Sequence, residues 1–211
     1  MQKYILQFIY SFVLRIFLKL IVGVKFDDAS FLEKEEQFVI LSNHNSHLDT
    51  LSIMASLPSS IIHRVKPVAA GDYFGRNKLI SWFSRFFINA VLLERNGVSE
   101  KSKGSPLAVI EKAIDEGYSL ILFPEGTRGQ PEKMKTLKRG IGIVLSKNKH
   151  VKYVPVYMDG MGKNLPKGET LIVPYNAKIK YGTPTTVISD DSKEIMTQIE
   201  HDILTLKAEL H

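Results

Sequence analysis

The chain contains no cysteine among its 211 residues and only one tryptophan. The missing thiols exclude a disulfide framework, a metal site or iron–sulfur cluster held by cysteine, and a cysteine nucleophile. Internal repeats, low-complexity tracts and long linkers are also missing. Hydrophobic residues make up 44% and charged residues 24% of the chain, which excludes a disordered protein and a protein with many membrane spans. The length suits one domain with a full-sized core.

Acidic residues are absent from residues 1–26, which carry four basic ones. Residues 27–36 reverse this balance, with five acids and one lysine, and residues 125–152 hold eight basic residues against two acids. The net charge of +6 therefore collects in two zones. It indicates an anionic partner: nucleic acid, a phosphorylated metabolite or an acidic membrane surface. Nucleic acid is the least favoured, because the basic run at 133–152 lacks interleaved aromatic side chains for base stacking.

The stretch from Tyr4 to Phe26 is mostly apolar, with polar residues spaced by four at Lys3, Gln7, Ser11, Arg15 and Lys19. A bilayer span needs about 20 predominantly apolar residues, and two of these cations would lie deep within it. No small-residue cleavage site follows an uninterrupted apolar run, as a signal peptide requires. We predict an amphipathic membrane-interface helix over residues 1–26, followed by a single domain over 27–211. The alternative is a helix packed on the core.

Apolar runs typical of buried strands alternate with helical patterns in the rest of the chain. Strands are expected near 37–42, 66–70, 90–93, 118–123, 151–157, 170–173 and 177–181, and helices near 49–57, 77–87, 105–116, 138–146 and 195–210. This order predicts a single α/β domain with a central, mainly parallel or mixed sheet flanked by helices. Ligands of such sheets bind beyond the strand ends. Pro155, inside an apolar run, predicts an edge strand or a bulge.

The first polar loop, NHNSHLD at 43–49, directly follows an expected strand. His44 can act as a general base, and Asp49 can hold one of its ring nitrogens and fix the tautomer. Two other interpretations remain open from these residues alone. His44, His47 and Asp49 could ligate a metal, or Asp49 could be the N-cap of the next helix and His44 a structural residue.

The second polar loop, FPEGTR at 123–128, also follows an expected strand. Arg128 offers a bidentate fork to phosphate, and Gly126 lets a backbone amide approach an anion closely. Glu125 can orient that arginine or bind a substrate hydroxyl. Arg95 lies at another strand end, where an ordinary ion pair is the common explanation. The basic run at 133–152 can assist with phosphate binding or form a solvated basic face.

Together, NHxSxxD at 43–49, Glu94-Arg95, FPEGTR at 123–128 and VPV at 154–156 resemble the motifs of the glycerophospholipid acyltransferase family. Its best-known members are PlsC-type 1-acyl-sn-glycerol-3-phosphate (lysophosphatidic acid) acyltransferases. The resemblance covers residues 22–185 and includes the F-K-x-G-like stretch at 137–140. The chain departs from the family at Asn89-Ala90, where the second motif usually begins with glycine.

The resemblance implies an O-acyltransferase of phospholipid biosynthesis. Such an enzyme moves a fatty acyl group from acyl-CoA or acyl carrier protein to the free hydroxyl of a lysophospholipid. The expected acceptor is 1-acyl-sn-glycerol-3-phosphate, which gives phosphatidic acid, and another lysolipid is the alternative. The resemblance makes His44 the base, oriented by Asp49, with no metal and no cofactor beyond the acyl donor. It assigns substrate binding to Asn43, Ser46, Arg95, Glu125, Gly126, Thr127 and Arg128. It also implies attachment to the membrane, on the cytoplasmic face of the cell membrane.

Two other function classes compete with this interpretation. A metal-dependent hydrolase would use His44, His47 and Asp49 as ligands, but no further ligand cluster accompanies them in the sequence. A non-catalytic membrane-binding module would need only the N-terminal segment and the basic run. That module leaves the pattern of His44, Asp49, Glu125 and Arg128 unexplained.

Overall fold

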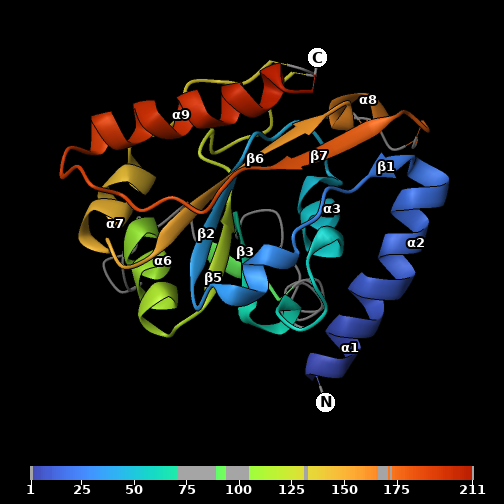
Figure 1. Ribbon diagram of the computed structural model, residues 1–211, viewed down its shortest axis with the longest axis horizontal. Helices are drawn as coiled ribbons and strands as arrows, with labels where there is room; N and C mark the ends of the chain where they lie inside the picture. Colours follow the sequence, from blue (N-terminus) through green and yellow to red (C-terminus); the bar gives the residue numbers. More distant parts are fainter. Residues whose placement is uncertain are drawn as a thin grey trace.

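The computed structural model describes residues 2–70, 89–93, 105–130, 133–165, 171 and 173–210. In these residues one sheet has the strand order β1-β7-β6-β2-β5-β3-β4 (Figure 1). The strands are β1 (Val24–Lys25), β2 (Phe38–Ser42), β3 (Val65–Ala70), β4 (Val91–Leu93), β5 (Ser119–Leu122), β6 (Lys152–Asp159) and β7 (Ala177–Tyr181). Neighbouring strands are parallel except β6 and β7, which are antiparallel. The predicted α/β class with a mainly parallel, mixed sheet is confirmed.

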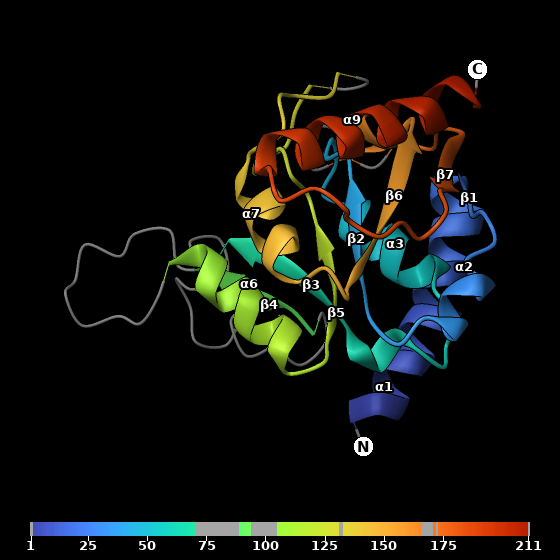
Figure 2. The ribbon, with the colours of Figure 1, turned by 60° about the vertical axis from the view of Figure 1, so that its left-hand side comes forward.

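Helices cover both faces of this sheet (Figures 1 and 2). Among the described residues, the helices beyond the N-terminal segment are α3 (Asp49–Ser56), α6 (Pro106–Asp115), α7 (Gly140–Lys147), α8 (Met161–Asn164) and α9 (Ser192–Ala208), with 3₁₀ turns at Ser30–Lys34 and Ile62–Arg64. Side chains alternate along β2, so that Phe38 and Ile40 pack toward α3 and the N-terminal helix. Val39 and Leu41 pack toward α6, α7 and α9 on the opposite face. Strands buried on both faces need continuous apolar runs, which explains the sequence pattern.

The N-terminal helix, Gln2–Val22, combines α-helical turns (α1, Gln2–Phe8; α2, Arg15–Phe17) with π-helical turns (Ile9–Leu14 and Leu18–Val22). Its apolar residues form three rows with the same spacing of four as the polar row. One row, Leu6, Tyr10, Leu14, Leu18 and Val22, packs on the domain, and a second, Tyr4, Phe8, Phe12, Ile16 and Leu20, is exposed. The third row, Ile5, Ile9, Val13, Phe17 and Ile21, lies between these two and is partly exposed. A spacing of four drifts along an α-helix of 3.6 residues per turn, and the wider π turns offset that drift.

The helix ends earlier than predicted, at Val22 rather than at Phe26. Gly23 has a φ of +83°, a left-handed conformation that glycine adopts without strain. Val24 and Lys25 then form β1 and pair with Ala177 and Lys178 of β7. The segment after the helix is thus an edge strand of the sheet.

Most other predicted elements lie where the sequence places them, with two differences among the described residues. Leu171 and Val173 are not part of a strand, and the helix expected at 77–87 lies outside the described residues. Of the two positions predicted from Pro155, an edge strand or a bulge, the edge strand is wrong, because β6 lies between β2 and β7. The pairing shifts by one residue between the Val156–Tyr181 pair and the Tyr153–Thr185 bridge, as it does at a bulge. The Pro155 carbonyl accepts from Gly182, one residue beyond the last β7 pair at Tyr181. Backbone N and C=O of one residue face the same side of a strand, so the missing N–H faces the interruption between the last β7 pair and the bridge of Tyr153 with Thr185.

Candidate active site

The two motif loops lie together at one edge of the sheet. β2 and β5 are adjacent and parallel, with Leu41 paired to Leu122, so the loops after them leave the same edge. The amide of Gly129 donates to the carbonyl of His44 at 2.8 Å and joins the loops directly. The His44 ring stacks on Phe123 with ring centres 4.1 Å apart. The two loops that follow expected strands in the sequence, at 43–49 and 123–128, therefore lie side by side at one edge of the sheet.

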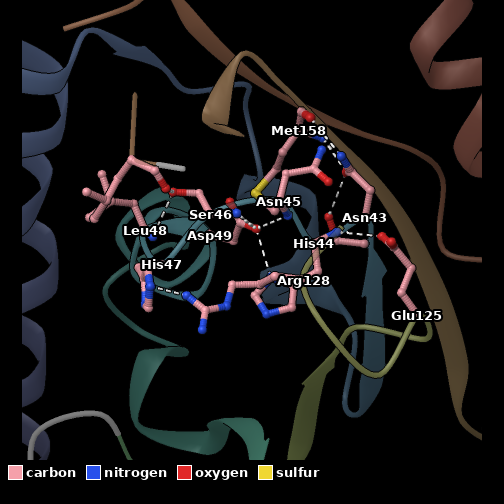
Figure 3. A network of polar contacts seen from close by, with 12 residues as sticks. Asn43, His44, Asn45, Ser46, His47, Leu48, Asp49, Glu125, Arg128 and Met158 are labelled. Atoms are coloured by element: carbon pink, nitrogen blue, oxygen red, sulfur yellow. Dashed lines mark hydrogen bonds and ion pairs between the residues drawn. The ribbon is translucent and has the colours of Figure 1, made fainter. Parts of the chain in front are cut away.

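His44 and Asp49 form a hydrogen-bonded pair. Asp49 Oδ2 lies 2.8 Å from His44 Nδ1 (Figure 3). A carboxylate only accepts, so Nδ1 carries a proton, and in the neutral imidazole the lone pair lies on Nε2. The Asp49 side chain is fully buried, whereas that of His44 is 20% exposed. The arrangement therefore places a buried acceptor behind an imidazole that a substrate can reach.

Backbone amides fix Asp49 in this position. Its Oδ2 also accepts from the N–H groups of Asn45 at 2.7 Å and Ser46 at 2.8 Å. Asp49 is the first residue of α3, and the N-cap is Leu48, which makes no side-chain capping bond. The N-cap interpretation is therefore wrong, because the carboxylate turns back toward the loop instead of capping the helix. A negative charge in the first helical turn is also favourable to the helix dipole.

Glu125 connects the two loops. Its side chain is 2% exposed, and its Oε1 accepts from the backbone N–H of His44 at 2.7 Å. Its Oε2 accepts from the backbone N–H of Lys135 at 2.9 Å. Burial raises the pKa of Glu125 above its usual range, and the two amide bonds oppose that shift. Both oxygens thus bind main-chain amides, a role that sequence reasoning missed.

Arg128 reaches back across the site to the first loop. Its Nη1 contacts Nε2 of His47 (Figure 3). Burial first, and the charge of Arg128 second, lower the pKa of His47. A neutral imidazole can accept a hydrogen bond from the guanidinium. The contact involves Nη1 of Arg128 and not Nη2. His47 therefore turns toward Arg128, which does not favour a metal site formed by His44, His47 and Asp49. The described residues also contain no group of three or more His, Cys, Asp or Glu that could hold a metal.

Two lysines from the basic run pack on the FPEGTR loop. Lys135 Nζ donates to Thr127 Oγ1 at 3.1 Å and to the Arg128 carbonyl at 2.8 Å. The Lys138 side chain lies directly over Gly126, whose φ is +74°, and leaves no space there for a Cβ. This part of the basic run belongs to the site.

The rest of the run lies elsewhere. Lys152 begins β6, at the sheet edge opposite the site, because β6 is parallel to β2. Lys147, Lys149 and Lys152 pair there with Glu111, Asp190 and Glu35. The single basic zone of the sequence is thus divided between two edges of the sheet.

Asn43 and Ser46 hold the first loop to neighbouring elements. The Asn43 amide donates to the Met158 carbonyl and accepts from the Met158 N–H, both at 2.8 Å. Ser46 Oγ donates to the Leu165 carbonyl at 3.0 Å and accepts from the Leu48 N–H at 3.2 Å. Both side chains face protein partners in this structure. Their expected substrate contacts remain predictions.

The structure describes only the first part of the second motif. Glu94 and Arg95 fall outside the described residues. Asn89 is described, and its φ of 57° is left-handed. Its side-chain amide donates to the carbonyls of His63 and Val65, both at 3.2 Å. Asparagine tolerates this region better than most residues, which explains its presence where the family usually has glycine.

Comparisons with known proteins are consistent with this geometry. A family model described as Acyltransferase matches residues 23–159. The chain is 24% identical over 204 residues to human 1-acyl-sn-glycerol-3-phosphate acyltransferase alpha, covering 92% of this chain and 67% of the human protein. It is 29% identical over 136 residues to a 1-acyl-sn-glycerol-3-phosphate acyltransferase of Chlamydomonas reinhardtii, covering 64% of this chain and 38% of that protein. The chain thus spans about two thirds of the length of its mammalian relatives.

A solved structure has the same fold. The crystal structure of the 1-acyl-sn-glycerophosphate (LPA) acyltransferase PlsC from Thermotoga maritima matches with a TM-score of 0.78 and 23% identity, covering 98% of this chain and 80% of that one.

Proposed function

The chain belongs to the acyltransferase family, and from this premise we propose that it transfers a fatty acyl group from a thioester to the free hydroxyl of a lysophospholipid. The observation that carries the proposal is the His44–Asp49 pair, 2.8 Å apart, beside a loop whose arginine and lysines suit a phosphate. The names of the relatives support 1-acyl-sn-glycerol-3-phosphate as acceptor and phosphatidic acid as product.

In the proposed reaction, His44 Nε2 takes the proton of the acceptor hydroxyl as its oxygen attacks the thioester carbonyl carbon. The carbon–sulfur bond then breaks, and the departing thiolate takes the proton from His44. Asp49 keeps the ring oriented and stabilises the imidazolium between these two steps. Direct transfer suits a chain without cysteine, in which the Ser46 hydroxyl already bonds to Leu165 and Leu48. Coenzyme A and acyl carrier protein are both possible carriers of the acyl group.

Product analysis tests this proposal. The purified protein is incubated with a panel of lysolipids and with each acyl donor, with and without EDTA, and products are identified by mass spectrometry. Acyl transfer to lysophosphatidate that survives EDTA is the expected result. Loss of activity in EDTA would favour the metal-dependent hydrolase, and no product with any acceptor would favour a non-catalytic membrane module.

We propose that Arg128 binds the acceptor phosphate. Arg128→Gln should raise the KM for lysophosphatidate about 10–100-fold, because charge-assisted hydrogen bonds contribute about 1.5–3 kcal/mol. Lys149→Gln is the matched control, since it removes one positive charge at the opposite edge of the sheet. Steady-state kinetics of both variants give the answer. Equal KM values for the two variants would remove Arg128 from the phosphate site.

We also propose that the N-terminal helix attaches the protein to the membrane interface. It is long and apolar enough to cross a membrane, yet Leu6, Tyr10 and Leu18 are buried against the domain. A helix held in this way can place its exposed row in the lipid while the domain stays in water. The side of the membrane on which the protein lies, expected to be cytoplasmic, remains a prediction.

Removing exposed aromatic rings from the helix should weaken membrane binding. Phe8 and Phe12 are more than half exposed and stack with ring centres 5.7 Å apart. The double variant Phe8→Ser, Phe12→Ser should bind vesicles at least about tenfold more weakly, because each ring loses favourable transfer into lipid. Leu204→Ser, on the exposed face of α9, serves as control. Cosedimentation with phosphatidylglycerol-containing vesicles measures the effect, and unchanged binding would contradict it.

A further inference from the structure

A second cluster of exposed apolar side chains lies outside the N-terminal helix. Leu171, Val173 and Tyr175 are 74%, 50% and 42% exposed, and we call these three side chains the apolar rim. Other large exposed apolar side chains among the described residues beyond the helix, Ile143, Ile188 and Leu204, are scattered along the chain. Exposed apolar side chains that gather in one place usually mark a binding surface.

The apolar rim is attached to the end of the N-terminal helix. The Tyr175 N–H donates to the Val22 carbonyl at 3.2 Å. The Tyr175 carbonyl oxygen would lie 3.0 Å from a Cβ at Gly23, so the two backbones are in close contact. Leu20 and Ile21, directly before this junction, are 72% and 56% exposed. Figures 1 and 2 both show β1 and the start of β7 beside this end of the helix. The exposed row of the helix therefore continues toward the rim.

The two segments that meet at this junction, residues 2–26 and 160–178, each carry a net positive charge. Lys163 Nζ lies 3.0 Å from the Tyr175 hydroxyl and 4.6 Å from the centre of its ring. Lys19 and Lys25 are exposed on the helix side. In the sequence, residues 2–26 carry four basic residues and no acid, and residues 160–178 carry three lysines and one acid, Glu169. Apolar side chains bordered by lysines, with a tyrosine between them, match the composition of protein surfaces at an anionic lipid interface.

We infer that the apolar rim is a second membrane contact, which enters the headgroup region of an anionic bilayer beside Leu20 and Ile21. The inference rests on the proposed attachment through the N-terminal helix. A single helix can roll about its axis on a membrane, whereas two contacts on different elements fix the orientation of the domain.

The rim is also connected to the active-site loop through the backbone. The Val173 N–H donates to the Asn164 carbonyl at 2.9 Å, and the next carbonyl, that of Leu165, accepts from Ser46 Oγ. Ser46 lies between His44 and Asp49 in the chain. A rim seated in the lipid would thus hold the loop of the His44–Asp49 pair at a fixed height above the bilayer, where a lysophospholipid hydroxyl is found.

Vesicle binding by matched variants tests the rim. The triple variant Leu171→Ser, Val173→Ser, Tyr175→Ser should bind phosphatidylcholine–phosphatidylglycerol vesicles at least about tenfold more weakly than the wild type. Ile188→Ser removes a more exposed apolar side chain, 88% exposed, and should bind as the wild type does. If the triple variant also binds as the wild type, while Phe8→Ser, Phe12→Ser does not, the rim contact is overturned and the helix attachment stands. If all variants bind equally, both the rim contact and the helix attachment are overturned.

A fluorescence measurement keeps the test independent of the folding of the triple variant. Tyr175→Trp is placed in a Trp82→Phe background, which leaves one tryptophan. Its emission should shift to the blue and be quenched by brominated lipids, whereas an Ile188→Trp protein should show neither effect. If the emission of the Tyr175→Trp protein is neither shifted nor quenched, the rim contact is overturned. If light scattering gives the triple variant a different molar mass from the wild type while its vesicle binding is unchanged, the rim contact is also overturned. That result would mean that a second copy of the chain covers the rim.

Discussion

His44→Ala is expected to reduce kcat for acyl transfer about 10²–10⁴-fold, the usual contribution of a positioned general base. The KM for the acceptor should change little, because Arg128 and the two lysines packed on its loop, Lys135 and Lys138, remain in place. His150→Ala is the matched control, since that exposed histidine lies just before β6, at the edge opposite the site. Steady-state and single-turnover rates with a saturating acyl donor measure the effect.

A His44→Ala rate within a few-fold of the wild type would remove the assignment of His44 as base. Circular dichroism of the variant shows whether it is still folded. A lost ring stack on Phe123 could loosen the loop, so His44→Gln provides a second variant that keeps a planar side chain there. Both variants should be slow if proton transfer is the missing step.

Glu125→Gln should produce the second large effect, about a 10²-fold loss of kcat, without any contact between Glu125 and substrate. The carboxylate accepts the backbone N–H groups of His44 and Lys135. A glutamine has one oxygen, so its NH₂ group must face one of these two amides and leave a buried donor unsatisfied. The loop that carries His44 would then shift, and a displacement of about 1 Å can cost about 10²-fold in rate.

The same substitution should lower stability by about 1–3 kcal/mol, the usual effect of an unsatisfied buried polar group. Glu111→Gln is the control, because Glu111 is a carboxylate that pairs with Lys147 far from the site. Kinetics and chemical denaturation of both variants provide the measurements. If Glu125→Gln raises KM for the acceptor with kcat unchanged, Glu125 binds substrate, as the sequence resemblance implies, and the loop-holding role is wrong.

The sheet and the His44–Asp49 pair could be predicted because their signals are local. Each central strand reads as an apolar run, since helices cover both of its faces. The pair is separated by five positions, close enough for the turn at the start of α3 to bring the carboxylate back to the ring. The cluster at one sheet edge follows from parallel strand order alone, so that prediction needed no side-chain detail.

The features that sequence reasoning missed depend on contacts between distant positions. Glu125 and His44 are 81 positions apart in the sequence. The group that donates to Glu125 is a backbone N–H, which every residue except proline has, so no residue type in the sequence indicates the contact. The basic run appears as one zone in the sequence, yet α7 carries the chain from the site to the opposite edge before Lys152. The π turns of the N-terminal helix keep a row of residues spaced by four against the domain, whereas the sequence analysis predicted only an amphipathic helix there.

Pro155 illustrates the same limit for strands. Proline favours an edge strand or a bulge because it lacks an N–H, and the sequence alone could not decide between the two. The structure places the missing donor where β7 has just ended, so an interior strand accepts the proline without losing a ladder bond. The length of the neighbouring strand decides the outcome, and no local pattern records it.

The most direct test is a single-turnover experiment with a labelled acyl thioester and lysophosphatidate, performed on the wild type and on Asp49→Asn in the presence of EDTA. The wild type should move the label to the lipid with no label bound to protein, and Asp49→Asn should do so at least about 10²-fold more slowly. Label that accumulates on the protein, or an Asp49→Asn variant as fast as the wild type, would contradict direct transfer by the His44–Asp49 pair.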